Sequence, residues 1–237
     1  MTSHLVALCL DANDPRGLSR FWAGVLGRET ADDGLSLLPS EDTGLRIEFQ
    51  PTREQKAGPN RMHLHLTSSS LDDQQSTVAR SLELGGRPLD IGQDPDDAHV
   101  VLADPEGNEF CVIEPGNSFL ADCGFLAEVA CDGSQEVGYF WSDALGWPLV
   151  WDQDQETAIQ SPRGGTKIAW GGPPVAPKTG KNRLHFDLAP PVGGDQQAEV
   201  DRLVSLGARR VDIGQGSVSW VVMADPDGNE FCVLTPR

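Results

Sequence analysis

Polar residues alternate with apolar ones in two matching segments of the chain. His63 and His65 stand between the apolar residues of segment 62–66, and His185 and Asp187 alternate with apolar residues in segment 184–188. This alternation is typical of a strand that buries one face, so the polar side chains should share the opposite face. Imidazoles and carboxylates gathered on one face can transfer protons, bind a metal ion or form hydrogen bonds to a ligand.

The same alternation places further polar side chains on such a face. In segment 45–50 the odd-numbered residues are apolar, which leaves Arg46 and Glu48 on the polar side. Glu109 and Cys111 also alternate with apolar residues and should face the same way. The candidate ligand-binding residues are Arg46, His65, Glu109, Cys111, Glu128, Lys167, His185, Asp187 and Cys232.

Two cysteines occupy the same place in repeated segments, and their chemistry has two interpretations. Cys111 and Cys232 would be nucleophiles only beside an activating base or cation, which His63 could supply to Cys111. We favour the alternative, a small buried side chain on a strand. The five cysteines are odd in number and form no CxxC pair, which argues against a disulfide framework and favours the cytoplasm.

The motif Asp-Pro-x-Gly-Asn occurs twice, beginning at Asp104 and at Asp225. Proline sets φ, and glycine allows the left-handed position of a tight turn, so each motif predicts a turn that leads into a strand. We expect the two aspartates to cap these turns. The motif lacks the alternating acids of a calcium-binding loop.

The chain contains a long internal repeat. Segment 84–93 recurs as 206–215 with seven of ten positions identical, and 104–112 recurs as 225–233 with eight of nine identical. The offsets of 119 to 122 residues indicate a duplicated domain rather than a short solenoid repeat. We therefore predict two domains, residues 1–116 and 117–237, with the boundary near Gly116.

Each copy divides again into two similar units, which begin near residues 4, 61, 124 and 183. A unit reads as a strand, an amphipathic helix and about three short strands. In the first unit, Asp14 is the predicted N-cap with Pro15 at the first helical position, and Gly27 is the predicted C-cap. The predicted fold class is α+β, with four βαβββ units.

Four such units in tandem resemble the vicinal oxygen chelate superfamily, which includes glyoxalases, bleomycin-resistance proteins and extradiol dioxygenases. The segments 182–188, 206–211 and 225–234 resemble its glyoxalase-like branch in particular. The resemblance implies two glyoxalase-like domains whose curled mixed sheets form open cups around a small molecule. It does not fix one reaction.

Metal-dependent members of this superfamily place ligands on the first and last strands of each unit. The resemblance carries these positions to two sets of four residues, Ala7, Glu48, His63 and Cys111 in the first copy and Leu126, Ala169, His185 and Cys232 in the second. Alanine and leucine offer no ligand atom, so we expect no transition metal in the second cup. A divalent metal in the first domain, held by Glu48, His63 and Cys111, stays open but is not favoured.

The function predicted from these observations is capture of a small organic molecule, such as an antibiotic or metabolite, in a cup. The alternative is a metal-assisted lyase, isomerase or dioxygenase in the first cup, with Glu48 and His63 as catalytic acid and base. A third interpretation is a scaffold whose cups are filled by side chains. We expect the first cup to be the more polar one. The sequence leaves open whether units one and two share a cup, or units one and four.

Composition limits the partners of the 237-residue chain. Its net charge of −18 should repel nucleic acids and anionic lipid, so neither is expected as a partner. No apolar run reaches the roughly 18 residues of a spanning helix. We expect a cytoplasmic protein, either a monomer with pseudo-dimeric tandem domains or a homodimer.

Overall fold

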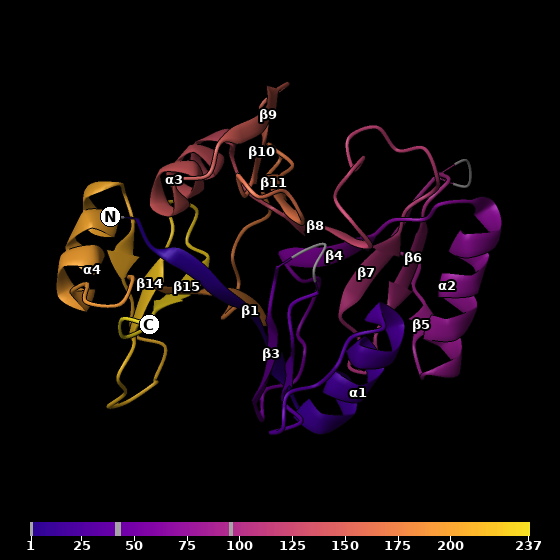
Figure 1. Cartoon of the computed structure of the whole chain (residues 1–237), viewed down its shortest axis with the longest axis horizontal. Helices are drawn as coiled ribbons and strands as arrows, with labels where there is room; N and C mark the ends of the chain where they lie inside the picture. Colours follow the sequence, from indigo (N-terminus) through magenta and orange to yellow (C-terminus); the bar gives the residue numbers. More distant parts are fainter. Residues whose placement is uncertain (1, 41–43, 95–96) are drawn as a thin grey trace.

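A computed structural model describes residues 2–40, 44–94 and 97–237. Four helices and fifteen strands occur in these residues (Figure 1). The helices are α1 (Pro15–Leu26), α2 (Leu71–Glu83), α3 (Gln135–Leu145) and α4 (Gln196–Ser205). The strands are β1 (His4–Ala12), β2 (Ser36–Leu37), β3 (Ile47–Pro51), β4 (Met62–Leu66), β5 (Arg87–Pro88), β6 (Val100–Ala103), β7 (Glu109–Val112), β8 (Leu126–Cys131), β9 (Leu149–Gln153), β10 (Glu156–Gln160), β11 (Lys167–Trp170), β12 (Leu184–Ala189), β13 (Arg209–Arg210), β14 (Val221–Ala224) and β15 (Glu230–Val233).

The strands form two mixed sheets, and each sheet combines units from both repeats. The seven-stranded sheet has the order β13-β14-β15-β12-β1-β3-β2, so it joins unit one to unit four. The eight-stranded sheet has the order β5-β6-β7-β4-β8-β11-β10-β9, so it joins unit two to unit three. The antiparallel pairs β1–β12 and β4–β8 are the two junctions between the repeats. This answers the question of unit pairing that the sequence left open.

The helices, in contrast, connect the two units of the same repeat. Trp22 of α1 packs on Phe110 of β7 with ring centroids 5.0 Å apart, and Trp141 of α3 packs on Phe231 of β15 at 5.1 Å. In Figure 1, α1 lies beside α2 at one end of the molecule, and α3 lies toward α4 at the other. The first helix of each repeat therefore packs on the last strand of the same repeat, while each sheet contains strands of both repeats.

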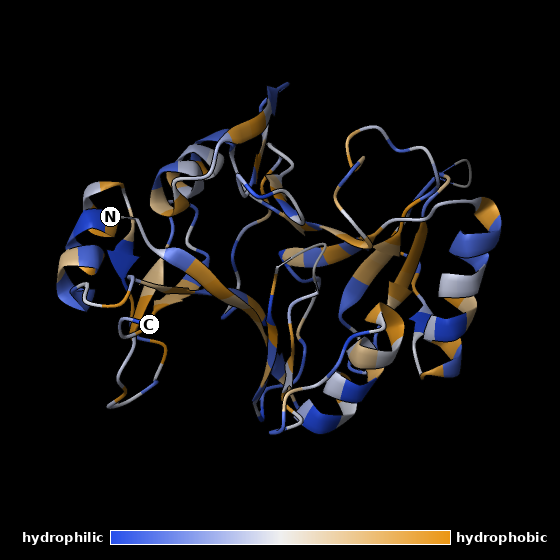
Figure 2. Ribbon diagram, in the orientation of Figure 1, coloured by the Kyte–Doolittle hydropathy of each residue, from blue (hydrophilic) through white to orange (hydrophobic). Residues whose placement is uncertain are grey.

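The predicted caps of α1 are confirmed. The side chain of Asp14 accepts a hydrogen bond from the Gly17 backbone at 2.9 Å, and Pro15 stands at the first helical position. Gly27 ends the helix with φ of 63°, a left-handed conformation that side chains with a Cβ rarely adopt. Figure 2 shows the helices as mixed blue and orange ribbons, as expected for elements that bury one face only.

The two Asp-Pro-x-Gly-Asn turns are built as predicted and also receive a tryptophan. Asp104 accepts hydrogen bonds from the backbones of Glu106 and Asn108, each at 2.9 Å. The indole Nε1 of Trp22 donates to the same carboxylate at 3.2 Å. Trp141 donates to Asp225 at 3.2 Å in the second repeat. Each turn therefore anchors the helix of the preceding unit.

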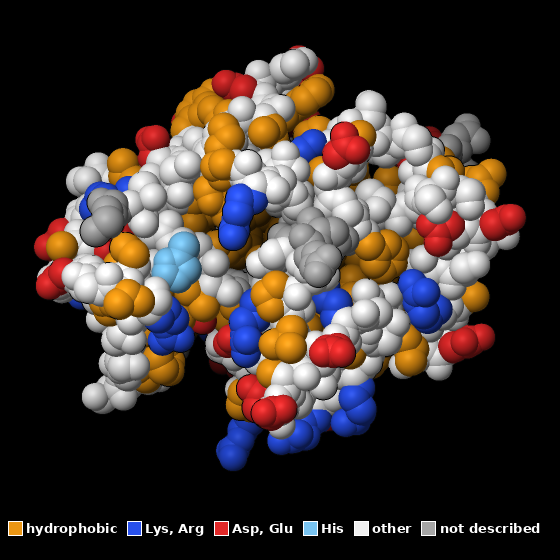
Figure 3. Space-filling model, in the orientation of Figure 1, with side chains coloured by type: hydrophobic (Ala, Val, Ile, Leu, Met, Phe, Trp, Pro, Cys, Tyr) orange, Lys and Arg blue, Asp and Glu red, His pale blue; other side chains and the backbone are white. Residues whose placement is uncertain are grey.

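Acidic and basic side chains are scattered over the face of the molecule shown in Figure 3. Across the described residues, no helix has both the length and the apolar character needed to cross a membrane.

Candidate functional site

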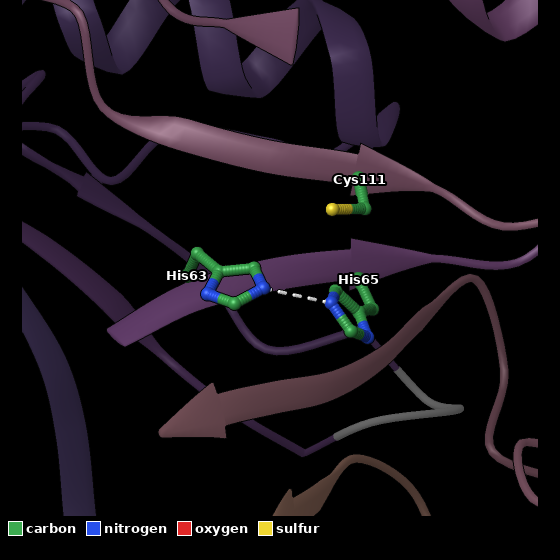
Figure 4. Close-up of side chains that lie close together, drawn as sticks. All are labelled: His63, His65 and Cys111. Atoms are coloured by element: carbon green, nitrogen blue, oxygen red, sulfur yellow. Dashed lines mark hydrogen bonds between the residues drawn. The ribbon is translucent and has the colours of Figure 1, made fainter. Parts of the chain in front are cut away.

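Strand β4 turns its two histidines away from the core. Met62, Leu64 and Leu66 belong to the buried core cluster, so His63 and His65 project from the other side of the strand. Figure 4 shows both imidazoles on one strand and the Cys111 side chain on the neighbouring strand β7. Across the junction, His63 is paired with Ala130 and His65 with Glu128 of β8. We call this polar side of the eight-stranded sheet face B.

A chain of hydrogen bonds runs along face B through residues of both repeats. His65 Nδ1 donates to Glu128 Oε2 at 2.6 Å, and His65 Nε2 lies 2.9 Å from His63 Nε2. Burial opposes a charge on His65, but hydrogen bonds with Cys111 and Glu128 and the charge of Glu128 outweigh it and raise the pKa of His65 to about 10. Burial, with the neighbouring His65 and His99, lowers the pKa of His63 to about 3.

These pKa values fix the protonation of the chain near neutral pH. His65 is an imidazolium whose two N–H groups point to Glu128 and to His63. His63 is neutral and accepts at Nε2, so its own proton is on Nδ1. The buried carboxylate of Glu128 thus stabilises the positive charge of His65. The N–H of His65 in turn sets the tautomer of His63.

A cavity of about 380 Å³ lies over the hydrogen bonds that link Glu128, His65 and His63. Phe119 and Trp151 form an aromatic wall, with ring centroids 5.6 Å apart in edge-to-face contact. The lining residues are Asn60, Arg61, His63, His65, Phe119, Glu128, Ala130, Cys131, Asp132, Trp151, Glu156, Thr157, Ala169, Trp170 and Gly171. Lys167 supports the wall, because its Nζ bonds the Phe119 carbonyl and lies 4.5 Å from the ring centroid of Phe119.

The polar side of the seven-stranded sheet, here called face A, carries a second cluster. Cys9 of β1 is paired with His185 of β12 and with Glu48 of β3. Ligand atoms of Cys9, His185 and Asp187 all lie within 4.8 Å of one another. Burial, and then the charges of Asp187 and Glu48, raises the pKa of the Cys9 thiol well above its usual value. Among the described residues, buried His185 Nδ1 and Asp187 Oδ1 have no hydrogen-bond partner.

The comparison with known proteins agrees with this architecture. A glyoxalase-like domain matches the sequence twice, at residues 7–113 and 127–234. The chain belongs to the glyoxalase-like domain family. None of the curated proteins matches the chain.

Two solved structures share the fold of this glyoxalase-like protein over nearly its whole length. Glyoxalase I from Zea mays is 13% identical with a TM-score of 0.63, and the match covers 99% of this chain and 92% of that chain. A putative dioxygenase from Bacillus subtilis subsp. subtilis str. 168 is 15% identical with a TM-score of 0.61, and the match covers 99% and 85% of the two chains. At such low identity the likeness concerns the fold alone.

The structure does not bring together the two residues predicted as catalytic. Glu48 lies on face A and His63 on face B, because units of different repeats pair to form each sheet. Glu48 Oε1 accepts from Arg46 Nε at 2.8 Å, with both side chains about one-third exposed, at 31% and 30%. An exposed pair of this kind stabilises by only about 0–1 kcal/mol. The polar residues that the sequence assigned to one cup of the first copy are therefore divided between two faces.

Glu109 of the glyoxalase-like chain is engaged within the fold. It binds Lys56 at 2.5 Å and the Asn60 backbone at 3.2 Å. Cys111 is paired with His65 across β4–β7, and its hydrogen bond with His65 helps to raise the pKa of that histidine. Cys232 is paired with Asp187, and burial followed by the Asp187 charge raises the pKa of its thiol. Cys232 fits a buried strand residue rather than an activated nucleophile.

The first-strand positions differ from those that the resemblance supplied. Leu126 packs in the core cluster, because β8 is irregular between its pairings with His65 and Leu66. The position paired with His63 is Ala130, and the position paired with His185 is Cys9. Counting back from the helix gave Ala7 instead of Cys9, although alternation places both residues on the polar face. Phe119 and Asp132 lie outside the strands and were not predicted as site residues.

The family's metal-dependent members raise the question of whether these residues fit a metal. Face B brings ligand atoms of His63, His65 and Cys111 within 4.8 Å of one another, but both nitrogens of His65 are hydrogen-bonded, and Ala130 and Ala169 beside them offer no further ligand. Face A fits better. Thiolate, imidazole and carboxylate are all zinc ligands, and Asp187 Oδ1, which has no hydrogen-bond partner and lies 3.5 Å from His185 Nε2, would gain a partner.

Proposed function

We propose that the glyoxalase-like protein binds a small, flat organic molecule in the cavity of face B. The observation that carries the proposal is the position of the hydrogen-bond chain under an open cavity of about 380 Å³. This volume is in the range of sites for small organic ligands, which are mostly apolar with a few placed polar groups. A cavity of this size also argues against a scaffold whose cups are filled by side chains.

The lining supports a flat ligand with a hydrogen-bond acceptor. Trp151 and Phe119 offer ring surfaces, which favour stacked or edge contacts with another ring. His63 stands at the floor of the cavity with a neutral imidazole whose proton is on Nδ1. Because the negative charge of Glu128 is balanced by His65, the floor is polar without a net charge.

Saturation-transfer NMR with a mixture of planar aromatic amides and acids tests this function. We expect several of these compounds to bind the wild-type protein. Trp151→Ala and His63→Leu should each weaken binding at least tenfold. Trp220→Ala removes a tryptophan that is 40% exposed and outside this lining, and it should change nothing. The proposal fails if no compound binds, or if all three variants bind as the wild type does.

A second function, metal-assisted chemistry, is favoured by a separate observation on face A. The unpartnered His185 Nδ1 and Asp187 Oδ1 are nine-tenths or more buried, and burying polar groups without partners is costly. Cys9, His185 and Asp187 would hold a divalent ion, which when bound would polarise a substrate oxygen. Calorimetric titration with Zn²⁺ tests this arrangement. We expect the wild type to bind Zn²⁺ with submicromolar affinity and Asp187→Asn and Cys9→Ser each to weaken this binding. Weak binding that is equal in all three proteins would contradict the metal site.

A further inference from the structure

A second cavity, of about 360 Å³, lies where the two repeats meet. It is bordered by segment 56–61 of the first repeat and by segment 176–183 of the second. Residues 56–61 and 178–183 are copies of one sequence, in which Lys, Gly, Asn and Arg recur at four of six positions. The two copies thus face each other across a local pseudo-twofold axis. We call this space the dyad cavity.

The lining of the dyad cavity is rich in cationic side chains, although the protein as a whole is acidic. Its lining contains five cationic side chains and one acidic side chain, that of Asp132, in a chain of net charge −18. The cationic residues are Lys56, Arg61, Lys178, Lys181 and Arg183. Each of the five is paired with an acid, Arg61 with Asp132 at 3.7 Å, so the lining offers N–H donors to an anion rather than a large net charge.

The cations are held in place by acids, most of which lie outside the lining. Lys178 binds Glu230 at 2.8 Å, Arg183 binds Glu106 at 2.6 Å, and Lys181 binds Asp11. Lys56 binds Glu109 at 2.5 Å in the same way. An ammonium has three donors and a guanidinium five, so these contacts fix the side chains without using all of their N–H groups.

Two of the remaining donors have no partner. Arg61 donates from its terminal nitrogens to the Ala176 and Asp132 carbonyls, and Arg183 donates to the carbonyls of Glu54 and Asp11. Among the described residues, the buried Nε atoms of both arginines lack an acceptor, although each side chain is only 10% exposed. An unpaired buried donor is costly, so an acceptor oxygen that reached either Nε would be stabilising.

We propose that the dyad cavity binds a small polyanion through its phosphate or carboxylate oxygens. The cavity volume exceeds a single phosphate, and guanidinium groups match the geometry of both kinds of oxoanion. Asn60, Arg61 and Asp132 line both this cavity and the cavity of face B, but the proposal does not require a ligand on face B. An anion bound here joins the two repeats at a point where both supply the same residues.

The test uses variants that add an acid to the lining without breaking an ion pair. Ala57 and Thr179 occupy the same place in the two copies, and both are exposed in the lining. Ala57→Glu and Thr179→Glu each place a carboxylate among the cations. Thr235→Glu adds the same charge at an exposed position outside the cavity and is the matched control. Thermal unfolding of each variant confirms that the fold is kept.

Isothermal titration with inorganic pyrophosphate, and separately with malonate, is done at constant ionic strength set with chloride. We expect saturable binding of one anion per wild-type chain. Ala57→Glu and Thr179→Glu should each weaken it at least tenfold, and Thr235→Glu should change it less than twofold. The tighter of the two anions identifies the preferred oxoanion. Absence of saturable binding by both anions, or an equal loss in all three variants, overturns the proposal.

Discussion

Glu128 of the second repeat lies 2.6 Å from His65 of the first, at the junction between strands β4 and β8. The pair is mostly buried, with side chains 8% and 19% exposed. A buried ion pair contributes little net stability as a whole, but removing one partner leaves an uncompensated charge. The two residues therefore couple the protonation of face B to the joining of the repeats.

Glu128→Gln should destabilise the protein near neutral pH by about 3–5 kcal/mol, because it leaves His65 buried without its anion. The pKa of His65 should fall from about 10. Histidine Cε1–H chemical shifts followed by NMR from pH 5 to 10 measure this pKa. A pKa of His65 that stays near 10 in the variant would show that Glu128 is not its cause.

The free energy of unfolding should also depend on pH through His65. The folded pKa of about 10 lies above the roughly 6.5 of an unfolded histidine, so the fold favours the protonated form. This contribution is complete below about pH 6.5 and is lost as the pH rises toward 10. Urea unfolding at pH 6.5, 8 and 9.5 should show a decline in the wild type that His65→Gln lacks. Parallel declines in the two proteins would contradict the prediction.

Asp225→Ala should destabilise the protein by about 3 kcal/mol or more, because four donors lose their acceptor. These donors are the backbones of Asp227 and Asn229, at 3.0 and 2.8 Å, the side-chain amide of Asn229 at 3.2 Å, and the indole of Trp141. Asp32→Ala makes the same change of charge at an exposed position and should alter stability by less than about 0.5 kcal/mol. Urea denaturation measures the free energy of unfolding of both variants. An equally small loss in the two would show that the turn at Asp225 is dispensable for stability.

Cys9, Cys131 and Cys232 should react slowly with iodoacetamide in the folded protein. Burial raises the pKa of each thiol, and the thiolate is the reactive form. Peptide mass spectrometry after timed alkylation at pH 8 measures each site, with protein in guanidinium chloride as the fully reactive reference. Fast labelling of Cys232 in the native state would instead support the nucleophile interpretation.

Cleavage between the repeats should leave the molecule assembled. A protease site inserted after Gly116, which is exposed, should be cut without separating the halves, because β1–β12 and β4–β8 remain hydrogen-bonded. Size-exclusion chromatography with light scattering should give the mass of the intact chain. Elution of two independent half-size species would mean that the sheets do not bind the repeats together.

Much of the fold follows from the repeated sequence and its alternation. The apolar residues around His63 and His185 predicted two strands, and both histidines project from strands whose apolar residues enter the core. The Asp14 cap and the two Asp-Pro-x-Gly-Asn turns could also be predicted. These features depend on neighbours in the sequence, which a single chain displays directly.

The content of each polar face could not be predicted, because it depends on pairing between distant strands. β1 and β4 pair with strands of the other repeat through backbone donors and acceptors alone. These groups are the same in every strand, so they do not specify a partner. A second error came from the spacing between strand and helix. Counting back from the aromatic pair gave Ala7 and Leu126, each 14 residues before Phe21 or Phe140. The residues that oppose the histidines are Cys9, 12 residues before Phe21, and Ala130, 10 residues before Phe140, so the first copy was misplaced by two positions and the second by four.

The assembly of each sheet from both repeats has a consequence for the history of the chain. A homodimer of one ancestral repeat with this pairing would contain two identical faces, since each would combine the same two units. Once the repeats are joined in one gene, a mutation in one copy changes one face only. His63 now opposes Ala130, whereas His185 opposes Cys9. Gene fusion thereby frees the two faces to evolve toward different ligands.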